Sequence, residues 1–218
     1  MDKTDKLTST QVSESDGLDD WRVLLRTLQS SFDTGSFAKG VEFAARVGAA
    51  ADAAEHHPDL MITYPRVHVL LTTHDADGLT SRDVDMARTI SSIADDLGIT
   101  SDPTAPTQLE IAIDALDIPG VKPFWEAVLG YKPHLDDDCL DPYGRSPAFW
   151  FQQMDAPRTQ RNRIHIDVTV PHDVAQQRIA AAIAAGGVLV SDKAAPAFWI
   201  LADREGNEAC ICTWQGRD

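Results

Sequence analysis

The sequence predicts an α+β fold divided into two domains. The chain has 218 residues, enough for two domains of about 100 residues that each bury a hydrophobic core. Residues 99–107 contain two prolines and no hydrophobic periodicity, as linkers commonly do. Strand-like and helix-like patterns occur on both sides of this segment. We therefore expect a first domain over residues 18–98, a linker over 99–107 and a second domain over 108–218.

The first domain is expected to follow a polar N-terminal stretch. Residues 1–17 show no periodicity and predict a disordered tail, frayed or only locally helical. Ser36 can cap a helix that ends near Ala54. The apolar stripe of this helix is expected to contain Phe37, Val41, Ala44, Gly48 and Ala51. The other expected elements are two short strands between Trp21 and Phe32, a strand pair over 60–64 and 67–73, and a helix after Thr80.

Two rounds of one element order follow the linker. Each round begins with a strand, continues with a helix closed by glycine, and returns through further strands. This repetition of element order, without repetition of residues, predicts an internal duplication. The expected elements are strand 109–115, helix 121–129 and strand 148–154, then strand 164–170, helix 173–185, strand 188–191 and a hairpin over 198–214.

Charge and composition narrow the functional classes. The net charge of −15 repels phosphate backbones and anionic lipids, so nucleic acid and membranes are poor partners. No apolar run approaches the roughly 18 residues of a membrane span, and the first residues lack a secretory signal. The three cysteines, Cys139, Cys210 and Cys212, favour reduced thiols over a disulfide framework. We expect a cytoplasmic protein.

A cluster of histidines and carboxylates is the strongest functional signal. His56, His57 and His74 lie between Glu55 and Asp83 in an otherwise ordinary segment. Neutral histidine accepts a proton and histidinium donates one near pH 7, so such a cluster suits proton transfer. A hydrogen-bonded structural cluster and a metal site are the alternatives, although the spacing matches no common zinc pattern.

Two positions near the cluster need separate treatment. His68 shares a strand face with His74 but lies six residues earlier, about 20 Å away at strand rise, so it is not expected in the same site. Asp83 matches a capping box with Thr80, yet it also falls on the core-facing stripe of the helix. Asp83 can therefore serve as a helix cap or as a carboxylate of the site.

The first domain resembles the pterin-4a-carbinolamine dehydratase family. The resemblance covers close to half of the chain and has no gap from His56 to Ala87. One departure is Asp52, at a position where the family often has glutamate. The matching residues are Asp52-x-x-x-His56-His57-Pro58, Tyr64, Val67-His68-Val69, Thr73-His74-Asp75, Gly78-Leu79-Thr80 and Asp83.

The resemblance implies a small α+β domain, an antiparallel sheet with helices on one face. The domain would form a homo-oligomer and bind a pterin as substrate, with no metal or other cofactor. The implied activity is that of a 4a-hydroxytetrahydrobiopterin dehydratase, a hydro-lyase that removes water from the 4a-carbinolamine to give quinonoid dihydropterin. This elimination needs an acid for the departing hydroxyl and a base for the N5 proton, and histidines can serve as both.

The resemblance also implies roles for the clustered residues. His57 and His74 are expected to be the acid/base pair, in an order that the sequence leaves open. His56 is expected to position the substrate or to share the proton transfer. Asp83 is expected to orient these groups.

Three further residues are expected to bind substrate. Pro58 would shape the bend after the histidines, and Asp52 would reach the site from the end of the preceding helix. Tyr64 would line the pterin pocket, and a tyrosine that covers the core is the alternative.

The second domain resembles the glyoxalase-like branch of the vicinal oxygen chelate superfamily, which implies paired βαβββ modules. Metal-dependent members take ligands from strands that correspond here to Glu110, His165 and Cys210, and only His165 is the commonest ligand type at its position. The supporting residues are Asp114-Ala115-x-Asp117, Phe124-Trp125-x-x-x-Leu129-Gly130-Tyr131, Asn162-Arg163-Ile164-His165-Ile166-Asp167 and Asp203-Arg204-Glu205-Gly206-Asn207-Glu208.

Strand alternation adds a candidate pocket in this domain. Glu110 and Asp114 share a face, His165 and Asp167 share a face, and so do Glu208 and Cys210, whereas the opposite faces are apolar. We therefore expect a cavity lined by Glu110, His165, Glu208 and Cys210, with His165 as a hydrogen-bonded cavity residue. A divalent metal at this place is the alternative.

Two other functions from different classes are retained. The second domain could be the principal enzyme, a metal-dependent lyase or dioxygenase. The first domain could instead be a non-catalytic partner-binding module. As a dehydratase, the protein would be linked to the pathway of a pterin-dependent hydroxylase.

Overall fold

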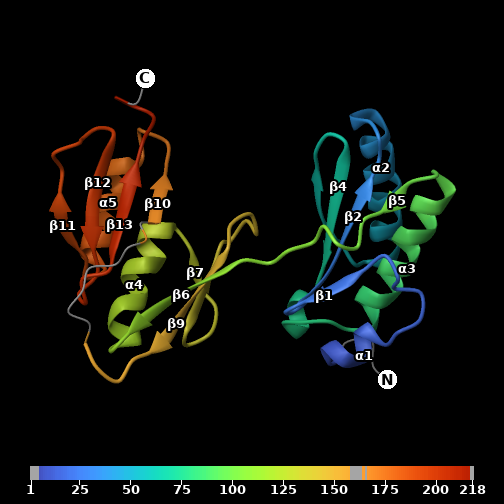
Figure 1. Cartoon of the computed structure of the whole chain (residues 1–218), viewed down its shortest axis with the longest axis horizontal. Helices are drawn as coiled ribbons and strands as arrows, with labels where there is room; N and C mark the ends of the chain where they lie inside the picture. The colour runs from blue at the N-terminus through green and yellow to red at the C-terminus, as the bar shows by residue number, and fades with distance from the viewer. Residues whose placement is uncertain (1–4, 158–163, 165, 217–218) are drawn as a thin grey trace. The chain divides into compact units, whose positions relative to one another are not determined.

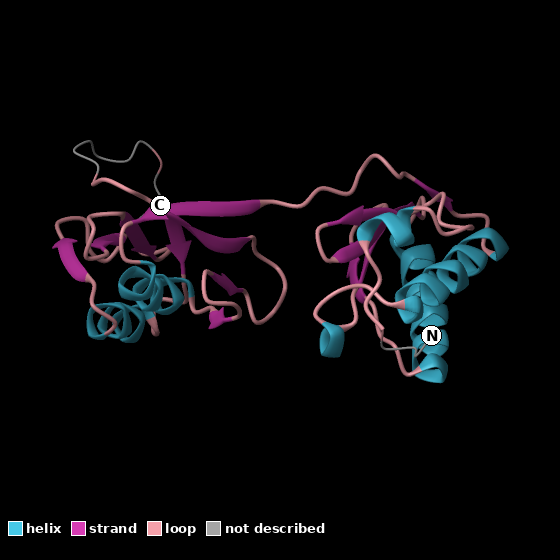
Figure 2. Cartoon of the chain, turned by 90° about the horizontal axis from the view of Figure 1, so that it is seen from below, coloured by secondary structure: helices cyan, strands magenta, loops and turns pink. Residues whose placement is uncertain are grey.

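The computed structural model describes residues 5–157, 164 and 166–216 of the chain. It divides the chain into two compact units, Met1–Gln108 and Leu109–Asp218 (Figure 1). In each unit the helices gather on one side of the strands, which confirms the predicted α+β class (Figure 2). No helix among the described residues is long and apolar enough to cross a lipid bilayer.

An antiparallel sheet forms the centre of the first unit. Its strands follow the order β1-β2-β4-β3, and β5 pairs with the end of β2. Alternation sets the two faces, because Val67, Val69 and Leu71 are buried while the residues between them are only partly buried. The strands are β1 (Arg22–Leu24), β2 (Thr27–Asp33), β3 (Asp59–Ile62), β4 (Arg66–Leu71) and β5 (Thr100–Ser101).

Two long helices, α2 (Phe37–Ala54) and α3 (Ser81–Asp96), pack on the buried face of this sheet. Ser36 caps α2 as expected, since its side chain accepts a hydrogen bond from the Lys39 N–H. Thr80 caps α3, which begins directly after it. The helix caps read from the sequence therefore mark where both helices start.

The buried stripe of α2 differs from the expected one. Phe37 and Val41 are 53% and 46% exposed. A Cβ built on Gly40 would lie 3.3 Å from Val67 Cγ2, so the helix approaches the sheet closely at this glycine. Periodicity favours a stripe through the large apolar residues and misses a contact that depends on the absence of a side chain. The buried residues of α2 are Gly40, Phe43, Val47 and Ala51.

The N-terminal stretch packs on the first unit where a disordered tail is expected. Helix α1 (Ser9–Ser13) begins with a capping box formed by Thr8 and Gln11. Val12 is fully buried in the core of the unit, and Leu7 packs against this core. Two apolar anchors in a polar segment are too few to produce a periodic signal, which explains the difference.

The beginning of the expected linker also belongs to the first unit. Ile99 is buried, and β5 extends the sheet beside β2. Asp102 accepts a hydrogen bond from Arg66 Nη1 at 3.1 Å. Hydrogen bonds from Thr104 and the Arg66 guanidinium lower the pKa of the Asp102 carboxyl.

The second unit consists of two modules with the same topology. Each module runs strand, helix and three strands, and its first strand pairs in parallel with its last. The sheet orders are β6-β9-β8-β7 and β10-β13-β12-β11, so the predicted duplication is present. The first module contains β6 (Glu110–Ala115), α4 (Ile118–Leu129), β7 (Lys132–Pro133), β8 (Asp138–Leu140) and β9 (Ala148–Gln153). The second contains β10 (Ile166–Thr169), α5 (Ala175–Ala184), β11 (Val188–Ser191), β12 (Phe198–Ala202) and β13 (Glu208–Cys212).

A shared core and polar contacts join the two modules. Trp125 of α4 donates a hydrogen bond from Nε1 to Asp203 Oδ2 at 3.1 Å, in the turn between β12 and β13. Glu205 of the same turn accepts hydrogen bonds from the N–H groups of Leu116 and Asp117 at 2.8 and 2.7 Å. A turn of the second module therefore satisfies backbone donors where the helix of the first module begins.

The three cysteines of this unit are free and buried. Cys210 is paired in register with Asp167 of the neighbouring strand. Burial, reinforced by Asp167, raises the pKa of the Cys210 thiol to about 12. Burial also raises the pKa of Cys139 to about 12. The cysteines are thus free thiols, as expected, and they are shielded from solvent.

We expect the native thiols to resist labelling with a disulfide reagent at pH 8. Only the thiolate attacks such a reagent, and thiols with a pKa of about 12 are almost entirely protonated there. The measurement is the absorbance released from Ellman's reagent before and after unfolding in guanidinium chloride. All three cysteines should react after unfolding. Rapid reaction of one equivalent in the folded protein would contradict this burial.

Candidate active site

The candidate residues of the first unit come from three neighbouring pieces of backbone. Helix α2 ends at Ala54, and Glu55 takes a left-handed conformation with φ of 51° that turns the chain into the bend His56-His57-Pro58. The 3-10 helix η1 (His74–Ala76) lies in the loop between β4 and α3. The first turn of α3 supplies Asp83. The fold thus brings together residues that are almost thirty positions apart.

Asp83 is fully buried and accepts hydrogen bonds from all three pieces. Its Oδ2 accepts the Thr80 N–H at 2.8 Å, which completes a capping box, and the Thr73 hydroxyl at 2.7 Å. Its Oδ1 lies 2.8 Å from His56 Nε2. A carboxylate buried without such partners would be strongly destabilising. Asp83 therefore caps the helix and also contacts a histidine of the site, so both interpretations of this residue hold.

His56 is held in one orientation by this contact. Its side chain is 7% exposed, and Nε2 points at the carboxylate. Because a carboxylate only accepts hydrogen bonds, Nε2 carries the hydrogen, and Nδ1 of the neutral ring is left as an acceptor. The pair can fix a ring for binding or for proton transfer.

His57 forms a second, exposed histidine–carboxylate pair. Its Nε2 lies 3.0 Å from Asp52 Oδ1, and the two side chains are 64% and 81% exposed. The aspartate therefore reaches the histidine despite being shorter than glutamate. An exposed pair of this kind contributes at most about 1 kcal/mol to stability, so its main effect is on ring orientation.

His74 is exposed at the first position of η1. Within the described part of the chain, no hydrogen bond joins it to His56, His57 or Asp83. Its loop closes on itself, since the Thr73 N–H donates to the Gly78 carbonyl at 2.9 Å. The link to the rest of the site runs through Thr73, the neighbour of His74, whose hydroxyl binds Asp83.

Three residues that contact the site are not among the candidates that the sequence suggested. Thr73 and Thr80 supply donors to Asp83, and their hydroxyl oxygens lie 2.8 Å apart. Arg82 donates to the backbone carbonyl of Glu55 and so ties the start of α3 to the bend. In the sequence, the two threonines at the ends of the histidine loop were the feature that could have indicated these contacts.

The remaining candidates of the first unit lie at opposite ends of the β3–β4 hairpin, because Asp59, next to Pro58, pairs with Leu70, whereas Ile62, next to the turn with Tyr64, pairs with Val67. Pro58 is half-buried in the bend, and Tyr64 is 75% exposed in the turn between β3 and β4. The exposure of Tyr64 contradicts a role in covering the core. His68 lies within β4, opposite Ser31 and Met61, and burial together with Arg66 lowers its pKa. It sits inside the sheet and not at the strand end that leads to His74.

The pocket expected in the second unit is only partly described. Glu110 is exposed at the start of β6, whereas Glu208 and Cys210 lie on β13 of the other sheet. His165 lies outside the described residues. Among the residues that are described, no group of three or more His, Cys, Asp or Glu side chains is arranged to hold a metal ion.

Comparisons with known proteins address both units. The model of the pterin 4 alpha carbinolamine dehydratase family matches residues 5–93, and that of a glyoxalase-like domain matches residues 110–212. A protein of Nostoc punctiforme, provisionally named pterin-4-alpha-carbinolamine dehydratase, is 41% identical over 91 residues, which are 41% of this chain and 98% of that protein. One from Thermomicrobium roseum with the same provisional name is 48% identical over 59 residues, 27% of this chain and 63% of that protein.

Two solved structures are also similar. The transcriptional coactivator/pterin dehydratase from Brucella melitensis has 32% identity and a TM-score of 0.40, with 41% of this chain and 99% of that chain covered. A glyoxalase/bleomycin resistance protein from Albidiferax ferrireducens has 20% identity and a TM-score of 0.40, with 48% and 95% covered.

Both resemblances drawn from the sequence are therefore confirmed. The first unit covers almost the whole length of a relative at 41% identity, and its histidines and carboxylates form the paired contacts described above. The chain belongs, through its first unit, to the pterin-4-alpha-carbinolamine dehydratase family, and a glyoxalase-like domain follows that unit.

Proposed function

We propose that the first unit removes water from 4a-hydroxytetrahydropterin to give quinonoid dihydropterin. An acid protonates the hydroxyl on C4a, which leaves as water when the C–O bond breaks. A base takes the N5 proton, and the C4a=N5 double bond forms. One acid and one base are sufficient for this elimination, so the proposed reaction uses no metal or other cofactor.

The observation that carries the proposal is the set of contacts at Asp83. This carboxylate joins the histidine bend, the histidine loop and the start of α3 through His56, Thr73 and Thr80. A purely structural cap would need only the contact with Thr80. The additional contacts support a site in which the bend and the loop are held at a constant separation.

We assign the proton transfers to His57 and His74. Both are exposed, so a bound pterin can reach them, whereas His56 is buried against Asp83. The contact of His57 Nε2 with Asp52 leaves Nδ1 for the substrate. His56 then acts as a fixed positioning group or shares the proton transfer.

Pro58 belongs to the proposed substrate site, because it limits the conformations of the bend. Tyr64 does not, because its turn lies at the end of the β3–β4 hairpin opposite to the bend. We assign the glyoxalase-like unit no reaction, and Glu110, His165, Glu208 and Cys210 remain its candidate pocket residues. A cytoplasmic location and a link to a pterin-dependent hydroxylase also remain predictions.

The direct test is dehydration of 4a-hydroxytetrahydropterin, followed by absorbance during rapid mixing. We expect catalysis well above the spontaneous rate, with kcat lowered by about 10²-fold or more in His57→Ala and in His74→Ala, since each removes one proton-transfer group. Dialysis against a chelator should leave the activity unchanged.

His68→Ala is the matched control, because this histidine lies inside the sheet and outside the proposed site. It should retain kcat within about twofold. Wild-type activity equal to the spontaneous reaction would end the proposal.

The double role of Asp83 predicts losses of both stability and activity. Asp83→Asn should lower the free energy of unfolding by about 1–3 kcal/mol, because the amide cannot accept from all its present donors. It should also lower kcat, because His56 and the histidine loop lose their common anchor. A double-mutant cycle with His56→Gln, measured by urea unfolding, should give a coupling energy above about 0.5 kcal/mol.

Asp85→Asn is the control for this experiment. Asp85 lies two residues after Asp83 in α3. It is exposed, and its Oδ1 lies 3.3 Å from Arg88 Nη1. Its replacement should change stability by less than about 1 kcal/mol and leave kcat unchanged. Full activity in Asp83→Asn would show that Asp83 caps the helix and has no role in the reaction.

We also propose that the protein is a homo-oligomer. Phe37 and Val41 form an exposed apolar strip on α2 that a second copy could cover. Light scattering coupled to size exclusion should give a mass that is a multiple of 23.8 kDa. The double substitution Phe37→Ser and Val41→Ser should shift the mass toward the monomer if this strip lies in the interface. A monomeric mass for the wild type would contradict the proposal.

A further inference from the structure

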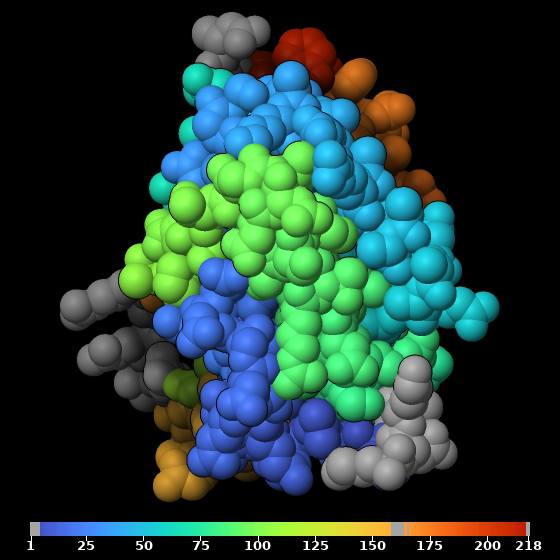
Figure 3. All heavy atoms as spheres, turned by 90° about the vertical axis from the view of Figure 1, so that its right-hand side faces the viewer, coloured from blue at the N-terminus to red at the C-terminus, as the bar shows by residue number. Residues whose placement is uncertain are grey.

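A lysine of the N-terminal segment reaches the loop that carries His74. Lys6 Nζ donates to the Asp77 carbonyl at 2.5 Å, and the Leu7 N–H donates to the Leu79 carbonyl at 2.7 Å. The segment is itself held in place, because Val12 is fully buried in the core. In Figure 3 the blue N-terminal residues lie against the green residues of α3. The N-terminal segment therefore connects the core to the histidine loop.

Gly78 makes room for this lysine. A Cβ built on Gly78 would lie 2.4 Å from Lys6 Cε and 3.1 Å from Lys6 Nζ. The aliphatic part of Lys6 thus rests directly on the α-carbon of Gly78. The backbone of Gly78 is not among those with positive φ, so the glycine is required here for space and not for an unusual conformation.

A second cation holds the same loop from the turn between β1 and β2. Arg26 Nη1 lies 3.3 Å from Asp77 Oδ2, and the Thr72 hydroxyl donates to the Arg26 carbonyl at 3.0 Å. The Asp77 N–H in turn donates to the His74 carbonyl at 3.0 Å. Whatever fixes Asp77 therefore also fixes the backbone of His74.

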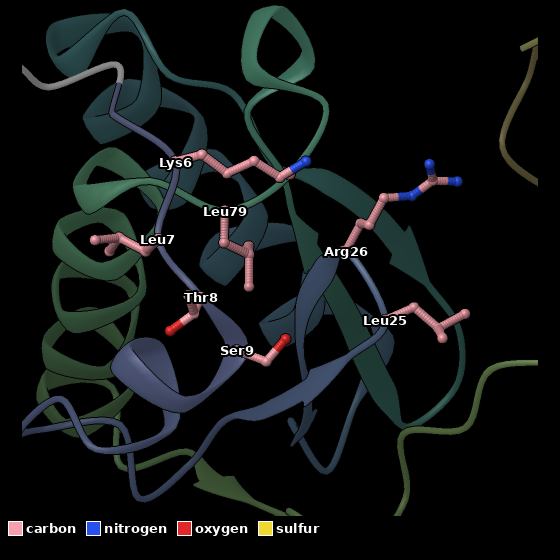
Figure 4. A pocket seen from close by; sticks show the side chains of 8 residues that line it. Lys6, Leu7, Thr8, Ser9, Leu25, Arg26 and Leu79 are labelled. Atoms are coloured by element: carbon pink, nitrogen blue, oxygen red, sulfur yellow. The ribbon is translucent and has the colours of Figure 1, made fainter. Parts of the chain in front are cut away.

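A cavity borders this side of the loop. Lys6, Arg26 and Leu79 contribute to the wall of a cavity of about 420 Å³ (Figure 4). The close-up shows Lys6 extending from the N-terminal segment toward the side on which Arg26 lies. Because the loop borders a cavity here, polar contacts with Asp77 have to supply the constraint that packing provides elsewhere.

We infer that Lys6 is a positioning residue for His74, and that the N-terminal segment acts as a strap on the loop 73–78. The inference rests on the proposed function, in which His74 exchanges a proton with the substrate. Loss of the strap frees the loop and lowers the fraction of time in which the imidazole is in reach of the substrate. A displacement of about 1 Å can reduce the rate by as much as about 10²-fold.

The test compares three variants of the full chain with one control. Lys6→Met removes the donor but keeps an unbranched apolar side chain, and Lys6→Arg keeps a donor. Gly78→Ala displaces the lysine without removing it. The control is Lys39→Met, because Lys39 Nζ also donates to a backbone carbonyl, that of Gly98, at 3.3 Å.

We expect kcat to fall by about fivefold to tenfold in Lys6→Met and in Gly78→Ala, with KM changed by less than about twofold. Lys6→Arg should recover most of the rate. Lys39→Met should match the wild type, and the melting temperatures of all four variants should stay close to that of the wild type. An unchanged kcat in both Lys6→Met and Gly78→Ala would overturn the inference.

Hydrogen exchange of the loop amides provides a measurement that does not depend on activity. The N–H groups of Ala76 and Asp77, which donate to the Thr73 and His74 carbonyls, should exchange faster in Lys6→Met than in Lys39→Met. If the wild type has no dehydratase activity, the proposed function fails and the exchange result alone decides on the strap. Equal exchange in the two variants would then refute it.

Discussion

The site of the first unit depends on one buried carboxylate. Asp83 has no solvent exposure, so every lone pair that it turns away from water must be satisfied within the protein. Its partners come from the bend after α2, the loop after β4 and the start of α3. The cost of leaving such a group unpaired is high, which forces these three pieces of backbone into one arrangement. The capping of a helix and the positioning of His56 are consequences of the same requirement.

Around this fixed centre the histidines differ in freedom. His56 is buried and bound to Asp83, whereas His57 is exposed and its nearest carboxylate, Asp52, is also exposed. His74 is exposed on a loop whose outer side borders a cavity, with contacts from Lys6 and Arg26 at Asp77. The proposed proton-transfer groups are thus exposed, whereas His56 and the carboxylate that binds it are buried. This division agrees with the general need of catalytic side chains for access combined with a constrained backbone.

The second unit is organised by a different constraint, the pairing of two similar modules. The turn that contains Asp203 and Glu205 belongs to one module and satisfies Trp125 and the backbone before α4 in the other. Burial raises the pKa of Cys139 and Cys210, so these two thiols stay protonated at neutral pH. None of the contacts that define the candidate site of the first unit involves this part of the chain. The chemistry at Asp83 and the packing of the modules can therefore be tested by separate substitutions.

The sequence by itself determined the α+β class, the two families, the capped starts of α2 and α3 and the duplicated modules. These features depend on local periodicity, on capping residues and on motifs whose spacing is short. It also determined that Asp83 is both a cap and a core-facing residue, because the two interpretations use the same helical geometry. Only the tertiary structure decided that Asp83 binds His56 and Thr73, since these contacts join positions that no local pattern relates. It likewise decided that α2 packs through Gly40 and not through Phe37, and that Lys6 donates a hydrogen bond to Asp77 in the histidine loop. The reason is the same in each case, because close approach and burial depend on the partner surface and not on the residue alone.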